Sequence, residues 1–97
     1  MAVKPEERIK QIEKMAKALG DKNRLVILQT IAEKGCVNCT EFTEIINLAQ
    51  PSVSHHIKIL VESGLINSDK EGRFVKLCIN RDNIEELSAF LKDLNKF

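Results

Sequence analysis

The sequence predicts a mainly α-helical fold with a small β-hairpin, in the order α-α-α-α-β-β-α. Apolar residues recur at helical spacing in four segments before Gly64 and in one segment after Asp82. Between them, two runs of β-prone residues flank a turn that contains Gly72. A chain of 97 residues is long enough for one domain, residues 1–97, and too short for two.

The first two helices are predicted over residues 5–19 and 21–35. Each has an apolar stripe at helical spacing: Ile9, Ile12, Met15, Ala16 and Leu19 in the first, and Leu25, Leu28, Ile31 and Ala32 in the second. Asp21 is suited to cap the second helix, and Gly35 is suited to end it. The connector that follows is a candidate for one short extra strand near residues 36–38.

The third and fourth helices are predicted to form a helix-turn-helix. The third can be capped by Thr40 or by Asn38 and buries Phe42, Ile45 and Ile46. The fourth begins near Pro51, whose fixed φ and missing N–H suit the first turn of a helix, and ends at Gly64. Two short helices joined by about four residues, the second with a polar front, are typical of this DNA-binding motif.

The polar face of the fourth helix differs from that of an ordinary surface helix, which usually carries Lys and Glu. It begins with short or flat groups that can hydrogen-bond base edges and phosphates. The candidates for groove contacts are Gln50, Ser52, Ser54 and His55, and Lys58 adds a charge. His56 is expected to bond a phosphate or to brace the helix. Because adjacent side chains on a helix point about 100° apart, His55 and His56 are not predicted to chelate one metal ion.

The hairpin and the last helix complete the pattern. Strands are predicted on both sides of residues 69–73, and the basic residues of the hairpin are Lys70, Arg73 and Lys76. These cations can hold phosphates or reach the minor groove. Asp82, with Glu85 at the capping-box position, predicts a last helix with a stripe formed by Ile84, Leu87, Phe90, Leu91 and Leu94. This order is that of a winged helix-turn-helix with an extra helix at each end.

The charge distribution supports a local docking surface more than a generally basic protein. The net charge is only +1, which by itself favours an ordinary solvated surface. Residues 1–19, however, carry five basic and three acidic groups, and residues 64–81 carry four basic and two acidic groups. The basic excess is therefore local, as a docking surface would need.

Three motifs in this order resemble the ArsR-type family of bacterial and archaeal winged-helix repressors, over residues 8–95. They are ALGDKNRLVIL at 18–28, QPSVSHHIKIL at 50–60 running on to ESGLI at 62–66, and EGR at 71–73 followed by FVKL at 74–77. The resemblance implies a sequence-specific DNA-binding regulator that represses a promoter containing an imperfect palindrome. It also implies release by a metal ion, a thiol oxidant or another inducer.

The resemblance further implies a homodimer built on the first and last helices. The apolar stripes of these helices offer more surface than one small core needs, and a two-fold dimer would bury it. The predicted interface residues are Ile9, Ile12, Met15, Leu87, Phe90 and Leu94. The alternative is that both stripes pack within one protomer.

The three cysteines leave the effector open. The family's arsenic- or cadmium-type ligand positions fall on Asn38 and Thr40, and the last helix has no histidine for the family's zinc site. Cys36 and Cys39, spaced by two residues, can ligate a soft metal or close into a reversible disulfide. A helix N-terminus near Cys39 would lower its thiol pKa. Cys78 is expected to act as a small half-buried hydrophobe, and an absence of any effector role for Cys36 and Cys39 remains an equal alternative.

Other function classes are less well supported. A winged-helix protein-interaction module without DNA binding is the alternative function, although it would favour apolar groups on the face that carries Ser52 and His55. No Gly-rich phosphate loop or metalloprotease helix accompanies the histidines, so an enzyme is not predicted. An odd cysteine count and the lack of an apolar leader favour the cytoplasm, and no apolar run is long enough for a membrane span.

Overall fold

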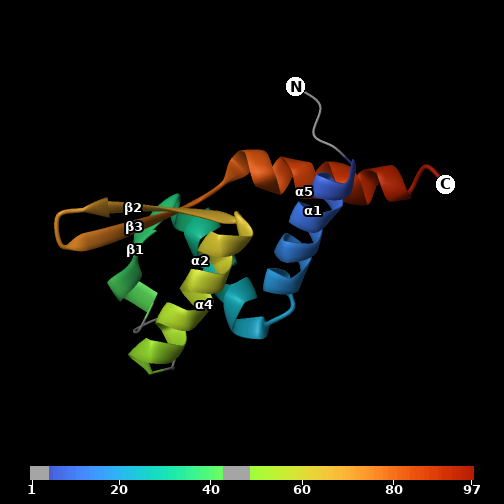
Figure 1. Ribbon diagram of the computed structural model, residues 1–97. Helices are drawn as coiled ribbons and strands as arrows, with labels where there is room; N and C mark the ends of the chain where they lie inside the picture. Colours follow the sequence, from blue (N-terminus) through green and yellow to red (C-terminus); the bar gives the residue numbers. More distant parts are fainter. Residues whose placement is uncertain (1–4, 43–48) are drawn as a thin grey trace.

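The computed structural model describes residues 5–42 and 49–97 and arranges their helices around one end of a small sheet (Figure 1). The elements are α1 (Pro5–Leu19), α2 (Lys22–Lys34), β1 (Cys36–Asn38), the 3-10 helix η1 (Cys39–Glu41), α4 (Gln50–Ser63), β2 (Ile66–Glu71), β3 (Phe74–Ile79) and α5 (Arg81–Leu94). The predicted third helix falls mostly on residues 43–48, including Ile45 and Ile46, which lie outside the described residues. The mainly helical winged helix-turn-helix prediction is confirmed.

The helix ends follow from local chemistry. Asp21 caps α2 as predicted, because its Oδ1 accepts hydrogen bonds from the backbone N–H groups of Asn23 at 2.8 Å and Arg24 at 3.2 Å. Gly64 ends α4 in the left-handed conformation, with φ 85°, which also agrees with the prediction.

The cap of α5 corrects the sequence-based expectation. The helix begins at Arg81, and Asn80 rather than Asp82 caps it, with its Oδ1 accepting from the backbone N–H of Asn83 at 3.1 Å. Asn is as good an N-cap as Asp, so both Asn80 and Asp82, two residues apart, were compatible with the sequence pattern.

The three strands form one antiparallel sheet in the order β1-β3-β2. The short extra strand predicted near residues 36–38 is confirmed as β1. Val37 lies opposite Leu77, and both side chains are buried, so this pair anchors the sheet to the core. Beyond β1, the hairpin of β2 and β3 projects from the body as a wing (Figure 1).

The core lies between the helices and the inner face of the sheet. Its buried hydrophobic residues are Ile12, Met15, Ala18, Ile27, Ile31, Val37, Phe42, Val53, Ile57, Leu60, Leu65, Ile66, Leu77 and Leu87. On α2 the inward positions are Ile27 and Ile31, whereas Leu25, predicted to point inward, is 48% exposed. None of the helices within residues 5–42 and 49–97 is long and apolar enough to cross a membrane.

Candidate nucleic-acid interface

Helix α4 has one apolar, buried face and one polar, exposed face, as a helix that lies in a DNA groove requires. Val53, Ile57 and Leu60 are buried against the other helices. The side chains of Ser52, Ser54, His55 and Lys58 are exposed, while that of Gln50 lies outside the described ones. The exposed groups are hydroxyls, an imidazole and one ammonium, which together can donate to and accept from base edges and phosphates.

His56 points inward and braces α4. Its Nδ1 lies 3.3 Å from Nη1 of Arg24 and 3.9 Å from Oδ1 of Asp21, and only 14% of its side chain is exposed. Arg24 also donates through Nε to the carbonyl oxygen of Ala18 at 2.7 Å. Of the two roles predicted for His56, these contacts favour the brace, and they leave His55 as the imidazole that faces outward.

The carboxylate in this cluster has an altered acidity. The backbone N–H of Arg24 donates to Asp21 and lowers the pKa of that carboxyl below 3.8; partial burial opposes this effect. The backbone N–H of Asn23 and the charges of His56 and Arg24 lower the pKa further. The same side chain therefore caps α2 and, through His56, contacts α4.

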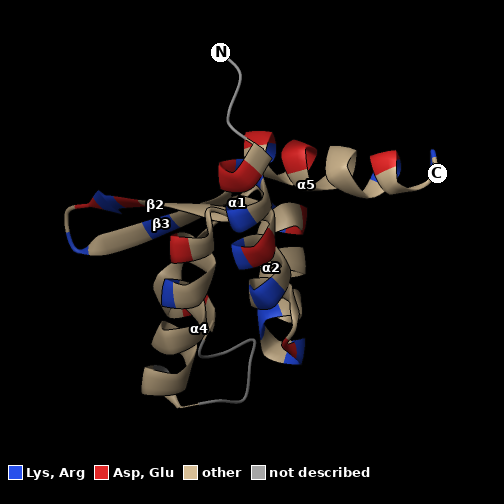
Figure 2. Cartoon of the chain, turned by 45° about the vertical axis from the view of Figure 1, so that its right-hand side comes forward, with Lys and Arg blue, Asp and Glu red and all other residues tan. Residues whose placement is uncertain are grey.

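The wing carries the predicted cations, but the structure does not gather all three at one point. Lys70, Arg73 and Lys76 are all exposed, and basic residues mark the wing and its tip in Figure 2. Lys70 lies opposite Val75, and Lys76 lies opposite Asp69. Because successive residues of a strand point to opposite faces, Lys70 and Lys76 lie on opposite faces of the hairpin and would reach different phosphates.

The cysteines pair differently from the prediction. Cys36 is bonded to Cys78, not to Cys39, because β1 and β3 place these two residues directly opposite each other with Cα atoms 4.5 Å apart. Cys39 is free, and burial raises the pKa of its thiol, which contradicts the expected lowering. Cys78 is half-buried, as predicted, but it is a disulfide partner and not a passive hydrophobe.

A soft-metal site at Cys36 and Cys39 does not fit this state of the molecule. The sulfur of Cys36 is committed to the disulfide and offers no thiolate. Within residues 5–42 and 49–97, no three His, Cys, Asp or Glu side chains are grouped closely enough to hold a metal ion. The described sulfur groups are the Cys36–Cys78 disulfide and the free thiol of Cys39.

The six predicted dimer residues fall into two groups. Ile12, Met15 and Leu87 are buried in the protomer's own core. They can therefore pack behind an interface but offer almost no surface to a second protomer. Ile9 and Leu94 are each 52% exposed, and Phe90 is half-buried under the guanidinium of Arg8. The C-terminal end of α5 extends past α1 (Figure 1), and Leu91 and Leu94 on this part of the helix are exposed.

Asn83 is a positioning residue that the sequence did not reveal. Its Nδ2 donates to the carbonyl oxygen of Gly64 at 2.8 Å, and its Oδ1 accepts from Nε2 of Gln11 at 3.1 Å. It therefore ties the end of α4 to α1 and α5. In the sequence Asn83 is one of several polar residues near the start of the last helix, so no specific signal pointed to this role.

Comparisons with known proteins agree with this geometry. A family model described as a helix-turn-helix domain matches residues 19–69. An HTH-type transcriptional regulator of Methanocaldococcus jannaschii, MJ1325, is 31% identical over 88 residues, which cover 91% of this chain and 99% of that protein. The arsenical resistance operon repressor of Bacillus subtilis is 30% identical over 81 residues, covering 84% of this chain and 77% of the repressor. The chain belongs to the ArsR-type family of helix-turn-helix transcriptional regulators.

Solved structures share this fold. The crystal structure of the ArsR family transcriptional regulator RHA00566 superposes with a TM-score of 0.82 at 28% identity and covers 99% of this chain and 94% of that one. A homodimeric winged helix-turn-helix DNA-binding domain from Mycobacterium bovis shares the fold with a TM-score of 0.76 at 20% identity, covering 99% and 88%. This ArsR-type chain is a DNA-binding regulator of transcription.

Proposed function

We propose that this ArsR-type regulator is a homodimeric repressor that binds an imperfect palindromic operator. The observation that carries the proposal is the exposed face of α4, where Ser52, Ser54 and His55 stand clear of the core beside a basic wing. Gln50 is included from its sequence position, Lys58 and the wing residues Lys70, Arg73 and Lys76 would contact phosphates, and His56 holds α4 from within. A regulator of transcription acts where the DNA is, so we retain the cytoplasm as its location.

The DNA-reading role is tested with an operator selected from a pool of random duplexes. Removing one base-edge contact typically costs about 1–3 kcal/mol, so His55→Ala should weaken operator binding by about 5- to 150-fold. Asn95→Ala, on the exposed end of α5, is the matched polar control and should bind as the parent does. Unchanged affinity in His55→Ala with an intact fold would remove α4's outer face from recognition, and selected sites without two-fold symmetry would contradict the dimer.

The dimer is supported by the exposed apolar residues of α1 and α5. A two-fold pair built on Ile9, Phe90 and Leu94 would bury this surface and hold two copies of α4 about 34–36 Å apart, one turn of DNA. Leu94→Glu should therefore convert the dimer to a monomer in sedimentation experiments. Leu25→Glu is the control, because Leu25 is exposed to a similar extent, 48% against 52%, but lies on α2. Dissociation by both variants, or by neither, would argue against this interface.

We assign release from DNA to oxidation of Cys36 and Cys78 in place of the Cys36–Cys39 pair. The bond joins β1 to the wing strand β3, and Cys78 lies two residues from Lys76 on the same face of that strand. Oxidation therefore constrains the strand that carries a proposed phosphate contact.

The redox assignment predicts that the reduced protein binds the operator more tightly than the oxidised protein. The expected ratio of the two affinities is about 5- to 150-fold, which corresponds to a coupling free energy of about 1–3 kcal/mol. The double variant Cys36→Ser/Cys78→Ser should bind like the reduced protein under all conditions. Cys39→Ser should keep the response. Equal affinity of the oxidised and reduced parent would refute redox control.

A further inference from the structure

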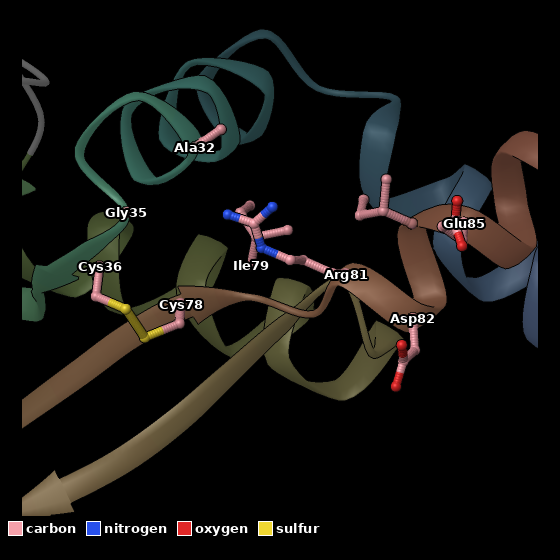
Figure 3. A pocket seen from close by; sticks show the side chains of 9 residues that line it. Ala32, Gly35, Cys36, Cys78, Ile79, Arg81, Asp82 and Glu85 are labelled. Atoms are coloured by element: carbon pink, nitrogen blue, oxygen red, sulfur yellow. A yellow bond between two sulfur atoms is a disulfide. The ribbon is translucent and has the colours of Figure 1, made fainter.

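A hollow of about 740 Å³ lies beside the disulfide and has no part in the DNA-binding surface. It is formed where the end of α2, the bond between Cys36 and Cys78, and the start of α5 meet (Figure 3). Its volume lies in the range of sites that take small molecules, about 300–1,000 Å³. The other lining residues that bear on its chemistry are Ala32, Ile79, Arg81, Asp82 and Glu85.

Arg81 supplies a cation to this hollow. In Figure 3 its guanidinium reaches over Ile79 into the space between α2 and the disulfide. Asp82 and Glu85 also line the hollow, on the side formed by α5. Within residues 5–42 and 49–97, Arg81 makes no side-chain hydrogen bond and no ion pair. A guanidinium presents paired donors that match a carboxylate, and because neither Asp82 nor Glu85 pairs with Arg81, these donors are open to the carboxylate of a ligand between α2 and the disulfide.

The disulfide supplies the reactive group. Cys36 is exposed and Cys78 is half-buried, so a small molecule in the hollow can approach the sulfur of Cys36. We propose that the hollow binds a low-molecular-weight thiol that bears a carboxylate, with the carboxylate on Arg81 and the thiolate directed at the disulfide. The proposal deepens the redox control proposed above and names the class of reductant that resets the protein.

The exchange is balanced by two thiols. The first thiolate attacks the sulfur of Cys36, the bond between Cys36 and Cys78 breaks, and Cys78 leaves as a thiolate that takes a proton from water. A second thiolate attacks the small-molecule sulfur of the mixed disulfide and releases Cys36 as a thiolate, which is also protonated. The products are the dithiol protein and the small-molecule disulfide, so the two thiols supply both electrons.

The test compares reduction of the full chain by thiols of different charge, without DNA. The probes are mercaptoacetate, which is anionic, 2-mercaptoethanol, which is neutral, and cysteamine, which is cationic, with rates expressed per thiolate and corrected for thiol pKa. Mercaptoacetate is expected to react at least about ten-fold faster than 2-mercaptoethanol, a difference equal to 1.4 kcal/mol. Cysteamine is expected to be slowest.

Arg81→Gln separates docking from general activation. It should reduce the preference for mercaptoacetate to near unity while leaving the rate with 2-mercaptoethanol close to that of the parent. Lys34→Gln is the control, because Lys34 is a nearby cation at the end of α2 that already pairs with Glu41 at 3.8 Å; it should keep the preference.

Two results would overturn the docking site: equal rates for the anionic and neutral thiols in the parent, or an equal slowing of all three thiols by Arg81→Gln. Operator binding is measured separately on the reduced and oxidised protein. A charge preference in reduction without any change in operator affinity would preserve this site and refute only the redox control of DNA binding.

Discussion

Reduction of the bond between Cys36 and Cys78 should destabilise the protein strongly. The two residues are 42 positions apart, and closing a loop of that length lowers the entropy of the unfolded chain by an amount worth about 4 kcal/mol at 25 °C. The folded state needs little rearrangement to keep the sheet without the bond, because Val37 and Leu77 remain packed between β1 and β3. Most of the loss should therefore come from the unfolded chain.

The measurement is urea unfolding of the oxidised and reduced protein, with free thiols counted in each sample. A loss of about 4 kcal/mol should lower the midpoint by more than about 1 M urea. In thermal unfolding the same loss corresponds to about 15–30 °C for a domain of this size. Because the effect acts through the unfolded state, the unfolding midpoint should change even where the folded spectra agree.

Cysteine variants provide the controls. Cys39→Ser should keep the full difference between oxidised and reduced samples, because Cys39 is outside the bond. Cys36→Ser/Cys78→Ser should unfold like the reduced parent and should not respond to reductant. A difference below about 1 kcal/mol, in samples whose thiol counts prove that the bond was present and then reduced, would refute the loop-entropy reasoning for this chain.

Three further predictions follow from other contacts. Gly64→Ala should lower the free energy of unfolding in the urea assay by about 2–3 kcal/mol, because φ is 85° and the new Cβ would lie 2.8 Å from Nδ2 of Asn83. Gly72→Ala should cost only about 1–2 kcal/mol in the same assay, because φ is 60° but no atom of the described residues beyond its chain neighbours lies within 4 Å of the new Cβ. The pKa of Asp21 is lowered in the folded state, so its stabilising contribution is complete above the unfolded value near 4 and is lost as the pH falls through the folded value; Asp21→Ala should flatten the pH dependence of stability below about pH 4. Arg73→Ala should reduce the slope of log affinity against log salt concentration by about 1 if Arg73 neutralises one operator phosphate, and an unchanged slope would exclude that contact.

Periodicity and turn residues predicted the fold well where a pattern extends over several turns. The bounds of α1 follow from the helical spacing of its apolar residues. Helix α4 begins one residue before Pro51, whose fixed φ suits a first helical turn, and ends before Gly64, whose positive φ few other residues adopt. Helix α2 shows the limit of this reasoning. Four consecutive apolar residues, 25–28, allow more than one inward face, and packing selects Ile27 rather than Leu25.

The sequence predicted which residue types form the candidate site, but not which of these residues contact or bond to one another. The polar front of α4 was visible in the sequence, yet the inward turn of His56 depends on Arg24, which lies 32 residues away. The disulfide could have been found only by aligning β1 against β3, because Cys36 and Cys78 become neighbours through strand register and not through spacing. The closer pair, Cys36 and Cys39, was favoured by sequence distance alone.

The contacts around α4 separate the reading helix from the redox bond. Midway along its length, α4 is held by His56 against Arg24. At its end the carbonyl of Gly64 accepts from Asn83, which also contacts α1 through Gln11. None of these contacts includes β1 or β3. Breaking the disulfide should therefore leave the position of α4 unchanged while it frees the base of the wing.

This separation distinguishes two forms of redox control. If the wing alone responds, oxidation should change the affinity for every operator by a similar factor and alter the salt dependence, because phosphate contacts carry little sequence information. The ranking of operators with single base changes should stay the same in both redox states. A changed ranking would mean that the bond also acts on α4, by a route that the contacts of His56 and Asn83 do not provide.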